Sequence, residues 1–236
     1  MPGETKEIAP YIHVPENCKT LKEAVERVHG DDGLTTIVVG AGEHQIDGIY
    51  LEVSSAMNIV GDPGVPRSGI VVVGGIKINE DIEGNCHLQH LTLRQAKATG
   101  VYAASSFTME DVLVEQCDHD GVFVVGTNTV GRCTNVEVHR CKESGMIVLE
   151  GGSIILSGPK TMVSHNCTKG FDSTYGLKVF GNINNIRIEY PLTKEKVSKN
   201  NKGGGDWSPN FDKPDPQPGG QSTSENWQGV ERLLRF

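Results

Sequence analysis

The sequence predicts an all-β fold, a parallel β-helix in which successive coils stack into a solenoid, and two observations support this prediction. First, a short phrase with apolar residues at alternating positions recurs along the middle of the chain. The five copies begin at Leu91, Val112, Val136, Met162 and Ile186. Second, these starts are 21, 24, 26 and 24 residues apart, which is typical of repeat proteins. Each copy therefore marks one coil.

A glycine and a second apolar alternation follow the first four copies, which predicts two strands per repeat. The glycines are Gly100, Gly121, Gly145 and Gly176. We expect the chain to turn at each glycine with positive φ. Alternation with period two directs Val112 and Val114 inward, and Leu113 and Glu115 outward. Because one coil cannot bury its inward face alone, neighbouring coils must stack at ~4.8 Å.

The phrase of alternating aliphatic residues, a polar or Cys position and then Gly-aliphatic-x-aliphatic resembles the repeat of the pectin lyase-like superfamily. The resemblance covers roughly residues 34–190. It implies a single-stranded, right-handed parallel β-helix with three sheets per coil. It implies little about activity, because the superfamily includes lyases, hydrolases, esterases, epimerases, tail spikes and non-catalytic scaffolds.

The pattern divides the chain into three parts. Residues 1–33 form an N-terminal segment with a capping helix over 20–29, because Leu21, Ala24 and Val28 share one helical face and Thr20 precedes Glu23 by three residues. Residues 34–192 form the β-helix. Residues 193–236 form an irregular tail rich in Gly and Pro with a possible short terminal helix.

Composition limits the partners and the compartment. The 236 residues carry a formal net charge of -8 and no run of Lys and Arg, so a nucleic acid partner is not expected. The chain starts without a charged segment followed by an apolar run, so we expect no secretory signal, no membrane span and a cytoplasmic protein. The sequence leaves the question of a cofactor open.

The spacing of the cysteines favours reduced core thiols over disulfides. Cys117, Cys141 and Cys167 end three successive copies of the phrase, so we expect them in one inward column. Three stacked cysteines cannot all pair, and free cysteine is among the most buried residue types. No Cys-x-x-Cys spacing occurs, so a zinc site is not expected.

The first strand's outward positions supply one candidate site. The column expected from the copies contains Arg94, Glu115, His139, His165 and Glu189. Two imidazoles between carboxylates could bind a divalent metal or act as an acid and a base. Charge pairing between strands on a solvated face explains the same residues, and we favour that explanation.

A second candidate is Asp118-His119-Asp120, in the turn before Gly121. It resembles acidic motifs of alginate epimerases and polygalacturonases, which implies carboxylates and a histidine that flank a sugar. The resemblance is limited to these three residues, and the signature motifs of pectinesterases and polygalacturonases are missing. An acidic turn balanced by Lys97 and Lys142 is the structural alternative.

The second strand's outward positions predict a binding surface. Tyr102, Phe123 and Ile147 should lie in register, followed by Lys178. Apolar residues in register on a surface need cover, and Trp207 and Phe211 of the tail are our first choice for it. Sugar rings or a protein partner could also occupy the column.

Two functions fit these features. The first is a binding or scaffolding β-helix that presents its outer columns, with Tyr102, Phe123, Ile147, Arg94 and Glu115, to a glycan or protein, without catalysis. The alternative is a polysaccharide lyase, epimerase or hydrolase that acts on an acidic polysaccharide with Asp118, His119, Asp120, His139 and His165. The acidic charge of the chain opposes a polyuronate substrate and favours the first function.

Overall fold

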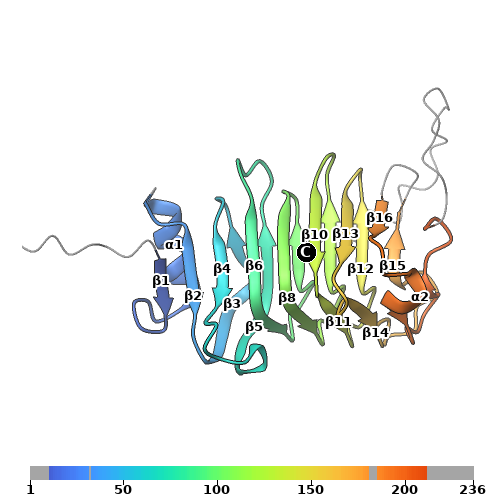
Figure 1. Cartoon of the computed structure of the whole chain (residues 1–236), viewed down its shortest axis with the longest axis horizontal. Coiled ribbons are helices and arrows are strands. Elements are labelled where there is room, and N and C mark those ends of the chain that lie inside the picture. Colours follow the sequence, from blue (N-terminus) through green and yellow to red (C-terminus); the bar gives the residue numbers. More distant parts are fainter. Residues whose placement is uncertain (1–10, 32, 181–184, 212–236) are drawn as a thin grey trace, which may run out of the picture.

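A computed structural model describes residues 11–31, 33–180 and 185–211. It confirms the parallel β-helix: the strands stack into a solenoid that runs along the long axis of Figure 1, from α1 at one end to α2 at the other. Every strand pairing between coils is parallel. A typical coil contains three strands, so the chain builds three sheets, named here A, B and C.

Sheet A contains the strands that open each coil. Its members pair in the order of the coils, and long strands contribute only their first half. The strands are β1 (Tyr11–Val14), β2 (Thr36–Val39), β4 (Asn58–Gly61), the start of β6 (Cys86–Arg94), the start of β8 (Phe107–Glu115), β10 (Val130–Thr134), β13 (Ser153–Ser157) and β16 (Asn185–Ile188).

Sheet B contains the first strand of the phrase identified in the sequence. The chain reaches it from sheet A through a residue with positive φ, such as His90 or Asp111, so β6 and β8 bend there without ending. The strands are the start of β3 (Gly42–Val53), the start of β5 (Ile70–Ile78), the ends of β6 and β8, β11 (Glu137–His139), β14 (Met162–Ser164) and β17 (Ser198–Lys199).

Sheet C contains the second strand of the phrase. Val122, Met146 and Leu177 point inward in successive coils and are fully buried. The strands are the ends of β3 and β5, β7 (Val101–Ala103), β9 (Val122–Val125), β12 (Met146–Leu149), β15 (Tyr175–Val179) and β18 (Gly205–Trp207).

Helix α1 (Leu21–Gly30) covers the N-terminal end of the core, as predicted. The Thr20 side chain accepts a hydrogen bond from the backbone N–H of Glu23, and the predicted face, with Leu21, Ala24 and Val28, is buried. This cap satisfies one of the free N–H groups of the first turn. Strand β1 precedes the helix and pairs with β2, so the solenoid ladder starts before residue 34.

The C-terminal end of the core is closed by residues that we expected on the outer surface. Trp207 pairs in register with the inward-facing Leu177, and Trp207 and Phe211 both pack against the main core. The ammonium group of Lys194, in the short helix α2 (Lys194–Val197), lies 4.9 Å from the centre of the Trp207 ring. The prediction that Trp207 and Phe211 cover Tyr102, Phe123 and Ile147 is therefore wrong.

The first three copies of the phrase align as predicted, but the last two do not. Glu137 pairs with Met162, and Val138 with Val163, so Val163 points inward where we expected Met162. Ile186 pairs with Ile154 in sheet A, so the fifth copy belongs to another sheet. A slip of one residue exchanges the faces of a strand, and His165 and Glu189 therefore leave the predicted ladder.

The glycines that precede sheet C have a different role from the one predicted. Gly100, Gly121 and Gly145 are not among the residues with positive φ. A Cβ atom on Gly121 would instead collide with Cγ1 of Val138 and lie 2.6 Å from the carbonyl oxygen of Gly145. Glycine is required here because the next coil packs directly against the backbone. The left-handed positions of this corner are Gln95, Gln116, Arg140, His165 and Asn200.

The cysteines are buried and unpaired, as predicted. Cys117 and Cys141 stack in one inward column, and the Cys141 thiol contacts Cys117. Asn166 occupies the next position in that column, because its side-chain oxygen accepts a hydrogen bond from the Cys141 N–H at 3.0 Å. The placement of Cys167 in the column is therefore wrong by one residue, although Cys167 is fully buried nearby.

We expect Cys117 and Cys141 to react with a thiol reagent only after unfolding. Both thiols are fully buried, and a hydrogen bond with Cys117, together with burial, raises the pKa of Cys141 well above its ordinary value, so a reagent meets little accessible thiolate there. Replacement of Cys141 by Ser should lower the free energy of unfolding by about 1 to 3 kcal/mol, because a hydroxyl replaces an apolar-like thiol in the core. Thiol titration and urea denaturation measure both effects, and rapid labelling of native protein would contradict the assignment.

Candidate functional site

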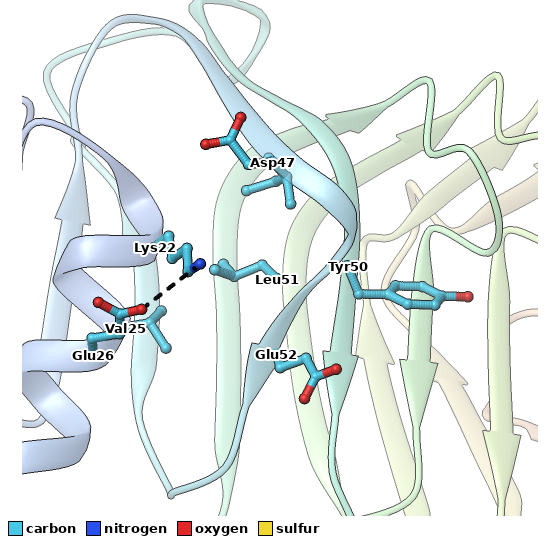
Figure 2. A pocket seen from close by; sticks show the side chains of 8 residues that line it. Lys22, Val25, Glu26, Asp47, Tyr50, Leu51 and Glu52 are labelled. Carbon is cyan, nitrogen blue, oxygen red and sulfur yellow. Dashed lines mark ion pairs between the residues drawn. The ribbon is translucent and has the colours of Figure 1, made fainter. Parts of the chain in front are cut away.

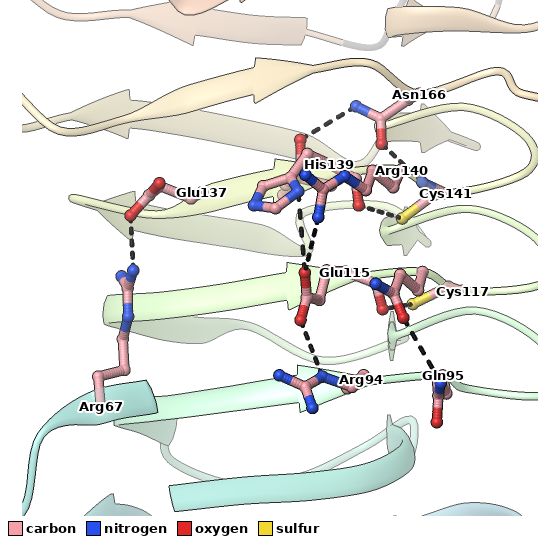
Figure 3. A network of polar contacts seen from close by, with 12 residues as sticks. Arg67, Arg94, Gln95, Glu115, Cys117, Glu137, His139, Arg140, Cys141 and Asn166 are labelled. Carbon is pink, nitrogen blue, oxygen red and sulfur yellow. Dashed lines mark hydrogen bonds and ion pairs between the residues drawn. The ribbon is translucent and has the colours of Figure 1, made fainter. Parts of the chain in front are cut away.

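The outer face of sheet B carries a charged cluster around Glu115 (Figure 3). Arg94 Nε lies 2.8 Å from one Glu115 carboxylate oxygen, while Arg140 Nη1 and His139 Nδ1 lie 3.8 and 3.9 Å from the other. The Glu115 side chain is only 7% exposed although it points outward. Two guanidinium groups and an imidazole thus surround one buried carboxylate, and the close contact with Arg94 offsets part of the cost of burying that charge.

A second group of charges pins a loop onto the same face, and sequence reasoning did not find it. Arg67, in the short helix η1 (Arg67–Gly69), contacts Asp111 at 3.2 Å and Glu137 at 2.6 Å. His90 Nδ1 lies 2.6 Å from Asp111, and its other ring nitrogen lies 2.8 Å from the Val65 carbonyl oxygen. These partners are up to 70 residues apart in sequence, so no local pattern predicts them.

The predicted ladder of Arg94, Glu115, His139, His165 and Glu189 is thus only partly assembled. The first three are adjacent on β6, β8 and β11. Ser164 takes the next place, while His165 lies in the column of Arg140, and Glu189 follows β16 of sheet A. Desolvation lowers the pKa of His139, and the Glu115 charge opposes that shift. The His139 side chain is only 21% exposed, so this position is less solvated than the predicted charge pairing on a solvated face implies.

Asp118 and Asp120 have different environments although they are only two residues apart. Asp118 is about half exposed and forms an ion pair with Lys142 at 2.6 Å, which is the structural alternative considered above. His119 is half-buried. Asp120 is buried, and its carboxylate accepts a hydrogen bond from the Ser144 N–H at 2.8 Å. The motif thus combines a surface ion pair with a buried carboxyl group.

The environment of Asp120 is unusual for a carboxyl group. Desolvation, assisted by the nearby Glu143 charge, raises the pKa of Asp120 to about 7. Lys178 acts in the opposite direction, and its own pKa is lowered by desolvation. Asp120 and Lys178 are therefore a pair of ionisable groups with shifted pKa values, and such pairs are enriched at functional sites.

We predict that Asp120 makes the protein less stable as the pH rises. Between the ordinary pKa of an aspartate and about 7, the folded state binds the proton that the unfolded state has lost, so the free energy of unfolding falls across this window. In the wild type, the free energy of unfolding should fall by on the order of a few kcal/mol between pH 4 and pH 8 because of Asp120. Asp120→Asn should abolish this contribution. Urea denaturation at several pH values measures it. The exposed Asp118→Asn is the matched control, and an unchanged pH dependence in Asp120→Asn would contradict the assignment.

The outer face of sheet C carries the predicted column in the predicted register. Tyr102 pairs with Phe123, Phe123 with Ile147, and Ile147 with Lys178. The rings of Tyr102 and Phe123 are stacked, with centres 5.2 Å apart and planes at 6°. Tyr50 adds a third ring 6.3 Å from Tyr102, and its hydroxyl accepts a hydrogen bond from the Thr99 N–H. Aromatic residues thus line this face across several coils.

Two shallow pockets adjoin these rings. The first lies between α1 and β3, where Lys22 and Glu26 of the helix face Leu51 and Glu52 of the strand (Figure 2). The second lies on the outer face of sheet C beside Tyr102. Glu52 lines both pockets, so the two pockets are adjacent. The first borders the capping helix and the second borders Tyr102. The second pocket is lined by Glu52, Lys77, Asn79, Glu80, Tyr102 and Ala104.

Among the described residues, no three His, Cys, Asp and Glu side chains are arranged to hold a metal ion. None of the helices that the structure describes is long and apolar enough to span a bilayer.

Comparison with known proteins adds a similarity of backbone. No protein-family model matches the chain, and no curated protein matches it. Among solved structures, the catalytic domain of a GH87 alpha-1,3-glucanase variant in complex with tetrasaccharides is similar to this chain, with 13% sequence identity and a TM-score of 0.41. The match covers 75% of this chain and 38% of the glucanase chain.

Proposed function

We propose that this protein is a non-catalytic binding protein that presents the part of the outer face of sheet C around Tyr102 to a glycan. The observation that supports the proposal is the pocket beside Tyr102, because it combines an aromatic ring with polar groups from neighbouring coils. Glu52, Lys77 and Tyr102 occupy one outward column on three successive strands. The β-helix therefore holds them in fixed positions about one rung apart.

The chemistry of the pocket favours a neutral saccharide. The face of an aromatic ring offers apolar contact for the C–H groups of a sugar, and Glu52, Lys77 and Asn79 can exchange hydrogen bonds with its hydroxyls. Two carboxylates, Glu52 and Glu80, outnumber the one ammonium group of Lys77. A uronate would therefore meet like charge, in a chain whose net charge is already -8.

The proposal includes a cytoplasmic location without a nucleic acid partner. All six cysteines are free and buried, which is typical of proteins from reducing compartments. The acidic charge of the chain opposes binding to a phosphate backbone.

Binding of neutral and acidic oligosaccharides, measured by calorimetry, tests the proposal. We expect a neutral oligosaccharide to bind and Tyr102→Ala to weaken its binding by about tenfold, equivalent to ~1.4 kcal/mol. Tyr190→Ala is the matched control, because Tyr190 is 97% exposed and lies outside sheet C. Equal affinity in wild type and Tyr102→Ala, or binding confined to polyuronates, would contradict the proposal.

The alternative is an enzyme acting on an acidic polysaccharide, and the shifted pKa values of Asp120 and Lys178 favour it. This alternative requires new reducing ends, unsaturated products or uronate units of inverted configuration when the protein is incubated with a polyuronate, corresponding to a hydrolase, a lyase or an epimerase. Asp120→Asn should then abolish product formation, whereas Asp118→Asn should retain it. We expect no product, because Asp118 is paired with Lys142, Asp120 is buried against Ser144, and His165 lies outside the column of His139.

A further inference from the structure

A second apolar cluster lies outside the main core, on the outer face of sheet C. It consists of Phe123, Val125, Ile147 and Leu149, named here the sheet C patch. These residues alternate with the inward residues of β9 and β12, so their side chains point away from the core. Their exposed fractions are nevertheless 3%, 7%, 1% and 2%. An outer surface this inaccessible to water has to be covered by other parts of the chain.

The apolar neighbours of the patch among the described residues do not account for this cover. The other apolar side chains that contact the patch, Tyr102, Ala104 and Phe180, are partly buried and belong to the same face of sheet C. Trp207 and Phe211, which were expected to cover this face, pack against the main core instead. Among described residues, the apolar partners of the patch are thus its own neighbours in the sheet.

Two segments lie outside the described residues and after the patch in sequence. Residues 181–184, Gly-Asn-Ile-Asn, contain a single apolar side chain. Residues 212–236 contain five large apolar residues near their end, with spacing that places several on one helical face. They are Trp227, Val230, Leu233, Leu234 and Phe236. The predicted terminal helix lies within this segment and thus outside the described residues.

The position at which the described chain ends makes the patch reachable. Phe211 follows β18, the last described strand of sheet C. The patch lies on β9 and β12 of the same sheet, where the strand order is β9, β12, β15, β18. Four strands at ~4.8 Å spacing place β9 roughly 15 Å from β18. The fifteen residues 212–226 can span up to ~50 Å when extended. The segment from Trp227 to Phe236 can therefore lie over the patch without strain.

We infer that the C-terminal segment, residues 227–236, docks on the sheet C patch of its own chain and covers Phe123 and Ile147. Burial of its apolar side chains against the patch removes both surfaces from water. The same position borders the pocket beside Tyr102, because Tyr102 and Ala104 contact the patch and line that pocket. The inference does not depend on whether the pocket binds a glycan.

The two tryptophans of the chain, Trp207 and Trp227, provide a direct test. In Trp207→Phe, the only remaining tryptophan is Trp227, and its quenching by acrylamide reports its access to water. We expect quenching several-fold weaker than in a free peptide of residues 221–236. Adding Ile147→Lys should restore strong quenching, because a charge then lies at the centre of the patch. Ile155→Lys is the matched control, because Ile155 is an outward, half-buried isoleucine of sheet A.

Further measurements decide the remaining cases. If Trp207→Phe does not fold, acrylamide quenching is measured in wild type and in Trp227→Phe. The difference between the two gives the quenching of Trp227. Protection of Trp227 that appears only with rising protein concentration, together with a dimer by light scattering, would assign the patch to a second copy and overturn the inference. Quenching equal to that of the free peptide would also overturn it. Truncation after Phe211 should lower the melting temperature and increase binding of a hydrophobic dye.

Discussion

Replacing Gly121 by Ala is expected to lower the free energy of unfolding by about 3 kcal/mol. This is the upper end of the range of about 1 to 3 kcal/mol that overpacking usually costs. The added Cβ would collide with Cγ1 of Val138 and lie 2.6 Å from the carbonyl oxygen of Gly145. Val138 is fully buried and β-branched, and the carbonyl oxygen is held by the ladder through the Val122 N–H. Neither neighbour can move away cheaply, so the coils must separate locally.

Gly30→Ala is the control for this substitution. Gly30 ends α1, and a Cβ atom there would meet nothing within 4 Å, so its effect should stay within ±0.5 kcal/mol. Urea denaturation followed by circular dichroism gives both free energies. Equal stability of Gly121→Ala and wild type would show that the coils at this corner are further apart than described.

Replacing Asn166 by Ala is expected to cost about 2 to 4 kcal/mol, because several buried hydrogen bonds depend on this one side chain. Its oxygen accepts from the Cys141 N–H, and its amide nitrogen donates to the Val138 carbonyl and to the Asn201 side chain, each at 3.0 Å. Asn166 is fully buried. Alanine leaves the Cys141 N–H without its side-chain acceptor and removes the two hydrogen bonds that the Asn166 amide donates.

Asn58→Ala provides the comparison for this effect. Asn58 lies on the outer face of sheet A, where its amide donates one hydrogen bond to the Thr36 hydroxyl at 3.1 Å. Loss of one partly solvated hydrogen bond should cost about 1 kcal/mol or less. If the two alanine variants lose similar free energy of unfolding, the Asn166 network contributes less than its geometry indicates.

The sequence determined the architecture where the repeat is regular. Alternation with period two placed Val112, Val114 and Val138 inward, and the structure buries all three. The column of Tyr102, Phe123 and Ile147 and the cap at Thr20 were likewise predicted, because each depends on residues close in sequence. The same reasoning missed the strands of sheet A as a separate set, since the recurring phrase covers only sheets B and C.

Contacts between coils decided what the local pattern left ambiguous. The triplet Met162-Val163-Ser164 permits either face inward, and the structure selects Val163. The column of Val114 and Val138 continues at Val163, and each valine packs against a glycine of the preceding coil, which for Val163 is Gly145. That choice moved Asn166 into the cysteine column and His165 out of the ladder. It depends on a neighbouring coil about 25 residues away, which only the tertiary structure supplies.

Contacts between coils also determined the chemistry of the candidate sites. The sequence identified Arg94, Glu115 and Asp120 as ionisable residues in outward or turn positions. It could not show that Arg140 would join Glu115, or that Asp120 would be buried beside Ser144. Burial and the charges contributed by other coils set these properties. The repeat pattern thus determined which residues face outward, and the stacking of coils determined which of them meet and how far each is withdrawn from water.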